Sequence, residues 1–447
     1  MSVGAPSNSS PSGGFLGVLR TNRNYRFMWS GQLVSEIGDN FNNVAVFSLA
    51  FANTHSGMAV AGILLARGVG VMLAGPIAGV LLDRMDRRRI MILSDLTRAA
   101  IALAFIYAIP PGHTPLLFVL SFLLMFASPF FTSGRSAILP TIASSHELHA
   151  ANSLTQITQW TTITIGSFLG GASVSSFGYR LAFVFNAASF LFSALCVSRI
   201  FVPEGFFANR TEGPDENSLT ENKVVRPWHE YKEGLRYMRA SPLILGIGLV
   251  GVGWATGGGA AQILFSLFGE VVFRRGPNGI GIIWGCAGIG LILGGIVAHQ
   301  LGPRLSFRGY KRAISICYII HGGSYVLFSQ AASFPWALVF IAISRGAVAV
   351  SSVLNSTQLL RRVSHDFRGR VFSTMETWTW MTMMVSMSIA GLASTNVNPR
   401  IIGAVSGVLS STTAIFWAWA NYTNRLPEPA LSGTNPDDVE VHGEPIV

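Results

Sequence analysis

Residues 59–89 read AVAGILLARGVGVMLAGPIAGVLLDRMDRRR, an apolar run that ends abruptly in a cluster of charges. About 20 apolar residues in a helix cross the hydrocarbon core of a bilayer, which is roughly 30 Å thick. Only helices and closed barrels can span that core, because every backbone polar group must be hydrogen-bonded internally. An uninterrupted apolar run indicates a helix, so this stretch predicts a membrane-spanning helix followed by a basic loop.

The same pattern recurs along nearly the whole chain of 447 residues. We expect twelve spans, at about 27–52, 59–82, 90–109, 115–138, 153–176, 181–201, 243–268, 279–301, 312–331, 335–357, 371–395 and 401–423. The composition agrees, because 50% of the residues are hydrophobic and only 12% are charged, whereas soluble proteins carry roughly 25% charged residues. The prediction is an all-α membrane protein and not a soluble enzyme.

A polar stretch at mid-chain divides the spans into two groups of six. The predicted domains are an N-terminal tail (1–26), a six-helix bundle (27–201), a central loop (202–242), a second six-helix bundle (243–423) and a C-terminal tail (424–447). In the central loop, Trp228–Met238 has the pattern of an amphipathic helix that lies on the membrane surface. Two short internal matches, each separated by about half the chain, indicate a repeated six-helix unit.

Most of the 31 Lys and Arg residues lie in loops on one side of the predicted membrane. The opposite side holds only Arg180, Arg274, Arg275 and Arg400. Cytoplasmic loops carry the basic excess, so both termini are predicted to be cytoplasmic, in a multi-pass protein of the bacterial inner membrane. This distribution also argues against a nucleic-acid partner, although the formal net charge is +10.

The first span carries four polar residues that lie three or four positions apart: Glu36, Asp39, Asn40 and Asn43. This spacing places them on one helical face. Ionisable groups inside a membrane span are costly and usually mark a functional site. We interpret Glu36 and Asp39 as groups that take up and release protons, and Asn40 and Asn43 as substrate-binding residues of a water-filled cavity.

Two arginines inside other spans complete the expected site. Arg345, in the tenth span, is predicted to hold an anionic or polar group of the substrate. Arg67, in the second span, lies near the depth of Asn43 and could pair with Asp39, so we also assign it to substrate binding. The alternative is that these charges form a static ion pair that stabilises the bundle.

Other polar or small residues in spans have structural interpretations. Asp95 and Arg98 are three apart and are expected to pair with each other. Arg135 lies near the end of the fourth span, where its side chain can extend to the membrane surface. His321 is assigned to hydrogen-bonded packing. The pair Gly290 and Gly294 is expected to allow close helix packing.

The loop after the second span reads GVLLDRMDRR at residues 79–88. It resembles the signature G-x-L-x-D-R-x-G-R-R of the major facilitator superfamily, with Asp86 in place of the second glycine. The resemblance implies a fold of two six-helix bundles in which spans 1, 4, 7 and 10 line a central cavity. It also implies a cytoplasmic gate whose charges pair and dock on the end of a neighbouring helix, formed by Gly79, Asp83, Arg84, Arg87 and Arg88.

Three further stretches, Trp29–Asp39, Trp228–Tyr237 and Arg368–Phe372, resemble the enterobactin-exporter and macrolide-efflux branch of the superfamily. This resemblance implies a secondary active exporter of a small organic molecule of the siderophore or drug type. Nothing in the sequence resembles a phosphate-binding loop for ATP, so we expect a proton gradient to supply the energy. We add Arg368, Arg370 and Glu376 to the gate, with Glu376 as a partner for its arginines.

An uptake carrier of the same fold is the alternative function, because no residue fixes the direction of transport. A membrane enzyme or receptor would need a paired nucleophile and base, a metal cluster or a large extramembrane domain, and the sequence indicates none of these. We therefore expect no cofactor and no metal. The expected partners are a small-molecule substrate, protons and the lipid bilayer, with the monomer as the functional unit.

Overall fold

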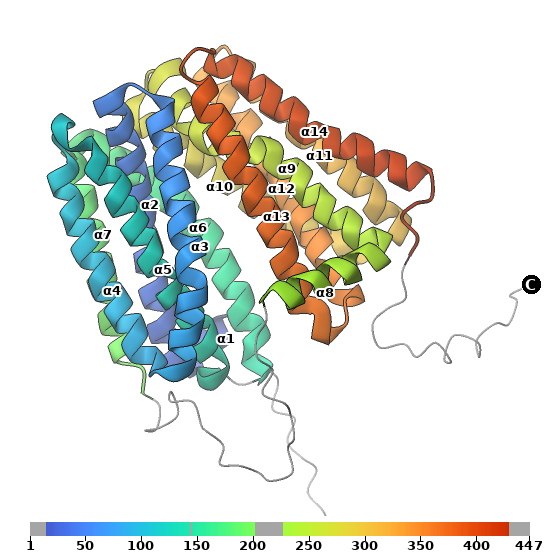
Figure 1. Cartoon of the computed structure of the whole chain (residues 1–447), viewed down its shortest axis with the longest axis horizontal. Helices are drawn as coiled ribbons and strands as arrows, with labels where there is room; N and C mark the ends of the chain where they lie inside the picture. The colour runs from blue at the N-terminus through green and yellow to red at the C-terminus, as the bar shows by residue number, and fades with distance from the viewer. Residues whose placement is uncertain (1–14, 144, 202–226, 429–447) are drawn as a thin grey trace, which may run out of the picture. The chain divides into compact units, whose positions relative to one another are not determined.

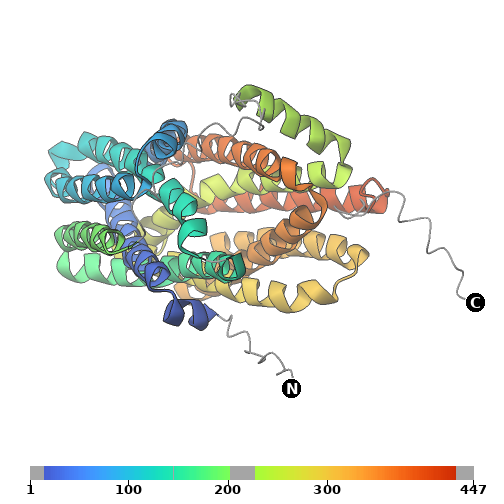
Figure 2. The ribbon, with the colours of Figure 1, turned by 90° about the horizontal axis from the view of Figure 1, so that it is seen from below.

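The computed structural model describes residues 15–143, 145–201 and 227–428, and the regular structure in these ranges is helical (Figures 1 and 2). Two short helices are α1 (Phe15–Thr21) and α8 (Pro227–Ala240). The long helices are α2 (Arg23–Thr54), α3 (Gly57–Arg84), α4 (Arg87–Ala104), α5 (Thr114–Ile142), α6 (Ser145–Phe177), α7 (Tyr179–Ser198), α9 (Pro242–Leu267), α10 (Gly276–Leu301), α11 (Phe307–Gln330), α12 (Phe334–Arg362), α13 (His365–Ala393) and α14 (Pro399–Tyr422). Each predicted span corresponds to one of them, which confirms the predicted all-α architecture.

Hydropathy separates the long helices into two groups. Eight of them are long and apolar enough to cross a membrane by sequence alone: α3, α4, α5, α7, α9, α10, α12 and α14. The other four, α2, α6, α11 and α13, are 32, 33, 24 and 29 residues long, so length is not what distinguishes them. They carry polar side chains along their length, such as Glu36 on α2 and His321 on α11. Polar groups on a spanning helix are typical of a surface that lines an aqueous pathway.

Residue contacts divide the chain into two compact units. Unit 1 comprises Met1–Val46 and Ala66–Gly213, and unit 2 comprises Phe47–Leu65 and Pro214–Val447. The end of α2 and the start of α3 therefore pack within unit 2. There Ser48 Oγ donates a hydrogen bond of 2.5 Å to Glu270 Oε1, in the π-helical turn that follows α9.

Both the interior and much of the surface are apolar. Tyr25 and Met28 belong to a buried cluster of unit 1, and Tyr310 belongs to one of unit 2. On the outside, Leu93 is 65% exposed and Phe416 is 70% exposed. A soluble protein seldom presents so many large apolar side chains to water, so this surface is suited to contact with lipid.

Glycines set the approach of α10 to α12 inside unit 2. A Cβ added at Gly290 or Gly294 would collide with the backbone carbonyls of Ala342 and Gly346, respectively. Small residues allow helix backbones to approach closely in membranes. The expected close packing at these two glycines is confirmed.

The predicted amphipathic helix at Trp228–Met238 is present as α8. Figure 1 shows α8 lying across the end of α13, and its second half packs there. The ring of Tyr237 stacks on that of Phe367, with centroids 4.7 Å apart. The side chains of residues 227–230 lie outside the described part of the structure, and the predicted position on a membrane surface stays a prediction.

Candidate functional site

Glu36 of α2 is half-buried in unit 1, and three side chains hold its carboxylate. Gln32 Nε2 donates to Oε1 at 2.7 Å, and Thr162 Oγ1 of α6 donates to Oε2 at 2.9 Å. Arg135 Nη1 of α5 lies 3.6 Å from Oε1. The guanidinium of Arg135 therefore pairs with this acid instead of extending to the membrane surface as expected.

Asp39 lies one turn further along α2 and is partly exposed. No described residue forms a hydrogen bond or an ion pair with its carboxylate. The charged side chains in its surroundings are those of Glu36, Arg67, Asp95 and Arg98. Asp39 therefore combines a partly exposed carboxylate with nearby charges of both signs.

The two asparagines of the polar face have different surroundings. Asn43 Oδ1 accepts a hydrogen bond of 2.6 Å from Arg67 Nη1, so two predicted substrate-binding residues contact each other. Asn40 Nδ2 donates to the backbone oxygens of Glu36 at 2.8 Å and Thr162 at 3.3 Å. The amide of Asn40 thus joins α2 to α6, and its donors are already used within the protein.

Asp95 and Arg98 on α4 form the predicted ion pair, and both are almost fully buried at 0% and 3% exposure. The Arg98 guanidinium lies over the rings of Phe131 and Phe190, 4.8 Å and 4.3 Å from their centroids. Asp95 Oδ2 and Arg98 Nε have no hydrogen-bond partner in the described structure. This pair has the solvent exclusion expected of a structural element.

In unit 2, Arg345 of α12 is 8% exposed. Its guanidinium lies over the ring of Phe265 of α9, 5.0 Å from the centroid. Arg345, Tyr325 and His321 line one small pocket between helices of this unit. The imidazole of His321 lies 2.8 Å from Ser344 Oγ, in keeping with the hydrogen-bonded packing expected for it.

Two of the three basic residues of the predicted gate in unit 1, Arg87 and Arg88, bind backbone carbonyls of neighbouring helices. Arg87 Nη1 donates to Ala137 O of α5 at 3.3 Å. Arg88 donates from Nε to Val197 O at 3.3 Å and from Nη2 to Ser198 O, at the end of α7. Carbonyls at a helix C-terminus attract cations, so Arg88 fastens the start of α4 to the end of α7. Arg84 is exposed, a Cβ at Gly79 would meet open space, and the side chain of Asp83 lies outside the described part.

Asp86, which replaces a glycine of the signature, begins α4. Its carboxylate accepts hydrogen bonds from the backbone N–H groups of Arg88 at 2.9 Å and Arg89 at 3.2 Å. An aspartate at this position satisfies N–H groups that have no partner inside the helix. The departure from the signature therefore supplies a helix cap.

In unit 2 the predicted gate residues contact two different elements. Arg368 donates to the backbone oxygens of Val363 at 3.1 Å and Leu360 at 2.8 Å, at the end of α12. Arg370 Nη1 lies 2.8 Å from Glu233 Oε2 of α8. Glu376 is exposed and forms no ion pair with a described residue, so the acid that meets the gate arginine is Glu233. The gating role of Glu376 stays a prediction.

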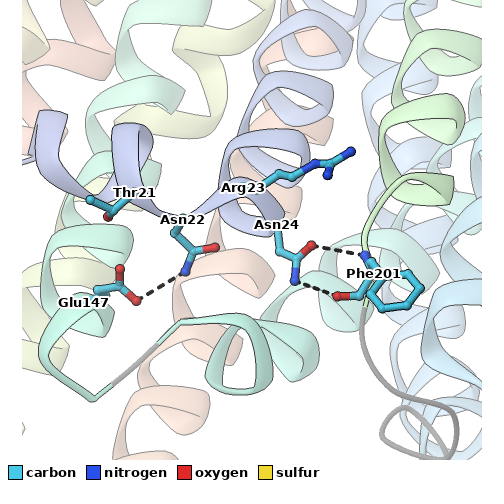
Figure 3. Close-up of a pocket in the computed structure, with 6 residues that line it drawn as sticks. All are labelled: Thr21, Asn22, Arg23, Asn24, Glu147 and Phe201. Carbon is cyan, nitrogen blue, oxygen red and sulfur yellow. Dashed lines mark hydrogen bonds between the residues drawn. The ribbon is translucent and has the colours of Figure 1, made fainter.

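A surface pocket of about 440 Å³ lies where α1 joins α2 (Figure 3). Asn22 Nδ2 donates to Ile142 O at 2.6 Å and Glu147 Oε2 at 3.2 Å, and Asn24 exchanges hydrogen bonds of 2.8 and 3.1 Å with the backbone of Phe201. These asparagines fasten the ends of α5, α6 and α7 to the start of α2. The pocket is open to solvent and lies at the first residues of α2, at the opposite end of the polar face from Asn43, so we regard it as a consequence of these helix contacts. Within the described ranges, no three His, Cys, Asp or Glu side chains gather as a metal site.

Comparison with known proteins places these features in a family. The model of the Major Facilitator Superfamily matches residues 28–377. The putative bacilysin exporter BacE of Bacillus subtilis (strain 168) is 25% identical over 91% of this chain and 98% of its own. Macrolide efflux protein A of Streptococcus pyogenes is 21% identical (89% and 96% covered), and the enterobactin exporter EntS of Salmonella choleraesuis (strain SC-B67) is 25% identical (88% and 91% covered).

Solved structures agree with this fold. A bacterial homologue of the iron transporter ferroportin in an inward-facing state superposes with a TM-score of 0.64 at 16% identity, covering 89% of this chain and 98% of that one. A single-residue mutant of the nucleoside transporter NupG superposes with a TM-score of 0.67 at 11% identity, covering 89% and 99%. At such identities the likeness shows the fold alone. The chain is a member of the Major Facilitator Superfamily, a multi-pass membrane transporter whose twelve spanning helices form two six-helix bundles.

Proposed function

We propose that this transporter exports a small organic molecule of the siderophore or drug type in exchange for protons, with alternating access. The observation that carries the proposal is the pair of carboxylates on one face of α2. Glu36 is held by Arg135, Thr162 and Gln32, whereas Asp39 has no hydrogen bond or ion pair within the described chain. An ionisable group in a membrane helix is energetically costly, and such groups usually mark a functional site.

The export direction rests on the names of relatives. Proteins named as exporters of bacilysin and enterobactin, and one named for macrolide efflux, align over most of this chain. The alternative, an uptake carrier of the same fold, is not better supported. We also propose that the monomer functions in the bacterial inner membrane with both termini in the cytoplasm, as the basic loops predict.

In this proposal Asp39 and Glu36 bind and release protons, and Asn43, Arg67 and Arg345 contact the substrate. Protonation of Asp39 would remove its attraction to the nearby arginines. The loss of this attraction would shift α2, and with it the carrier, toward one of its two facings. The gate arginines, which bind carbonyls at helix ends, would stabilise one facing of the carrier. In the static alternative the same charges only stabilise the bundle. This alternative predicts a transport rate that does not change with an imposed pH gradient.

The decisive experiment uses inverted membrane vesicles that contain the full-length protein and bear an imposed pH gradient. Candidate siderophores and antibiotics, including macrolides, are added outside, and their accumulation is measured. We expect accumulation that collapses when a protonophore dissipates the gradient. Accumulation of no compound, or accumulation that survives the protonophore, would contradict proton-coupled export. In a parallel assay with vesicles loaded with the same compounds, gradient-driven efflux would support the uptake alternative.

A further inference from the structure

A narrow pocket inside unit 2 brings together polar side chains from helices that are far apart in the sequence. Its walls are Gly257, Gly258 and Ala261 of α9, His321 and Tyr325 of α11, Arg345 of α12 and Ser410 of α14. The small residues of α9 make one wall almost bare backbone. In this conformation the side chains close the space between them, so an anionic end group enters only when these helices move apart slightly.

Arg345 is the charged member of this cluster and has no anionic partner. Its side chain is 8% exposed, and it forms no hydrogen bond or ion pair with any described residue. The ring of Phe265 approaches its guanidinium, and the titratable side chains that share the pocket with it are those of His321 and Tyr325. A buried cation without a counter-ion is strongly unfavourable, so this guanidinium is suited to receive an anion.

Tyr325 supplies a second donor. The residue is 2% exposed, and its hydroxyl has no hydrogen-bond partner in the described structure. Its ring is fixed by neighbours, with centroids 5.5 Å from Phe328 and 6.2 Å from His321. Buried hydroxyls are normally hydrogen-bonded, so an orphan hydroxyl beside a buried arginine indicates an absent acceptor.

His321 adds a wall whose ring is held in place by hydrogen bonds. Ser344 Oγ donates to the backbone oxygen of His321 at 3.1 Å and lies 2.8 Å from His321 Nδ1. Because the serine hydroxyl hydrogen is used toward that oxygen, Ser344 Oγ accepts from Nδ1–H, which fixes the ring and its tautomer. Arg345 supplies the permanent positive charge of the pocket, which suits a single negative charge.

We propose that Arg345 and Tyr325 form an anion subsite in unit 2 that binds one carboxylate-sized anionic group of the transported molecule. Arg345 pairs with the negative charge, and the Tyr325 hydroxyl donates a hydrogen bond to one of its oxygens. This inference rests on the proposed function and narrows its substrate class to molecules with an anionic end group. A free inorganic anion such as chloride also carries a negative charge that can pair with Arg345, so the test below distinguishes it from the anionic end group of a substrate.

The test is equilibrium binding to the purified full-length protein in detergent, by titration calorimetry. The probes are benzoate, its neutral counterpart benzamide, and chloride. We expect benzoate to bind and benzamide not to bind. Tyr325→Phe should weaken benzoate binding about tenfold, which corresponds to about 1.4 kcal/mol, and Arg345→Gln should abolish it. Tyr318→Phe, on the same helix but outside the pocket, is the matched control and should bind benzoate as the wild type does.

Several results would overturn the subsite. These are no measurable benzoate binding, equal binding of benzamide, or benzoate binding that is unchanged in both Arg345→Gln and Tyr325→Phe. Chloride binding that depends on Arg345 while benzoate fails to compete would assign the pocket to an inorganic anion instead. Tyr325→Phe keeps the ring and its packing, so the test does not depend on the folding of the arginine variant. No pH gradient is involved, so failure here is distinguishable from failure of proton-coupled export.

Discussion

Arg135 Nη1 lies 3.6 Å from Glu36 Oε1, so α5 supplies the basic partner of an acid on α2. The two side chains are 19% and 24% exposed. An ion pair in such a setting contributes about 1 kcal/mol or less to stability. Glu36 also keeps the hydrogen bonds from Gln32 and Thr162 when the arginine is removed. The pair therefore contributes little to stability, and its role has to be tested through transport.

Replacing the arginine separates its effect on stability from its effect on transport. In Arg135→Gln we expect the free energy of unfolding to fall by about 1 kcal/mol or less, while the rate of gradient-driven transport falls about tenfold, a change of about 1.4 kcal/mol in barrier. Thermal unfolding in detergent and vesicle uptake measure the two effects. Arg89→Gln is the control, because the 3.7 Å pair of Arg89 with Asp86 lies at an exposed helix start. Unchanged transport in Arg135→Gln would show that the pair has no part in coupling.

Asp39→Asn tests the proton-coupling role itself. The substitution keeps the size of the side chain, and no hydrogen bond or ion pair within the described chain is lost. We expect normal insertion and thermal stability, with transport that no longer responds to the imposed pH gradient. Counterflow, in which labelled substrate exchanges without net proton movement, should persist in the variant. A variant that is destabilised but still couples transport to the gradient would favour the static ion-pair interpretation.

Substitutions in the Asp95–Arg98 pair should lower the stability of the protein, unlike Asp39→Asn, which should change only the coupling of transport. Both side chains are buried, so Arg98→Gln leaves the carboxylate of Asp95 without its partner. Removing one member of a buried pair costs about 3–5 kcal/mol, whereas the double variant Asp95→Asn/Arg98→Gln leaves no unpaired charge and should recover most of this loss. Chemical unfolding of the purified variants measures both. A double variant as unstable as Arg98→Gln would mean that the rings of Phe131 and Phe190, and not the acid, need the guanidinium.

Asp86 can be tested as a helix cap in the gate loop. Asp86→Ala removes the acceptor of the Arg88 and Arg89 backbone N–H groups and should cost about 1 kcal/mol, whereas Asp86→Gly, which restores the residue of the family signature, should cost a few tenths. Thermal unfolding distinguishes the two. An equal loss in both variants would show that the carboxylate acts through its charge and not as a cap.

The helical periodicity of the sequence predicted the spans, the shared face of Glu36, Asp39, Asn40 and Asn43, and the Asp95–Arg98 pair. All of these depend on residues close together in one helix. It did not predict that Arg135 meets Glu36 or that Glu233 meets Arg370, because each pair joins helices whose relative rotation and depth the periodicity leaves open. The sequence did not single out Tyr325, because a tyrosine that binds a ligand and one that only packs look the same in an apolar span. The difference appears only in the structure, where the Tyr325 hydroxyl has no hydrogen-bond partner among the described residues.

The contact of α8 with α13 provides the last prediction. A Cβ added at Gly234 would lie 2.8 Å from both Arg370 O and Thr374 Oγ1, closer than a carbon can approach. Gly234→Ala should therefore push α8 away from α13 and weaken the 2.8 Å pair of Glu233 with Arg370. Gly369→Ala is a matched control, because that helical glycine has open space around an added Cβ. Alanine is favoured over glycine in a helix by up to about 1 kcal/mol, so the control should unfold at the same or a higher temperature. Gly234→Ala should unfold at a lower one, and equal shifts in the two variants would mean that α8 is not held against α13 in the folded protein.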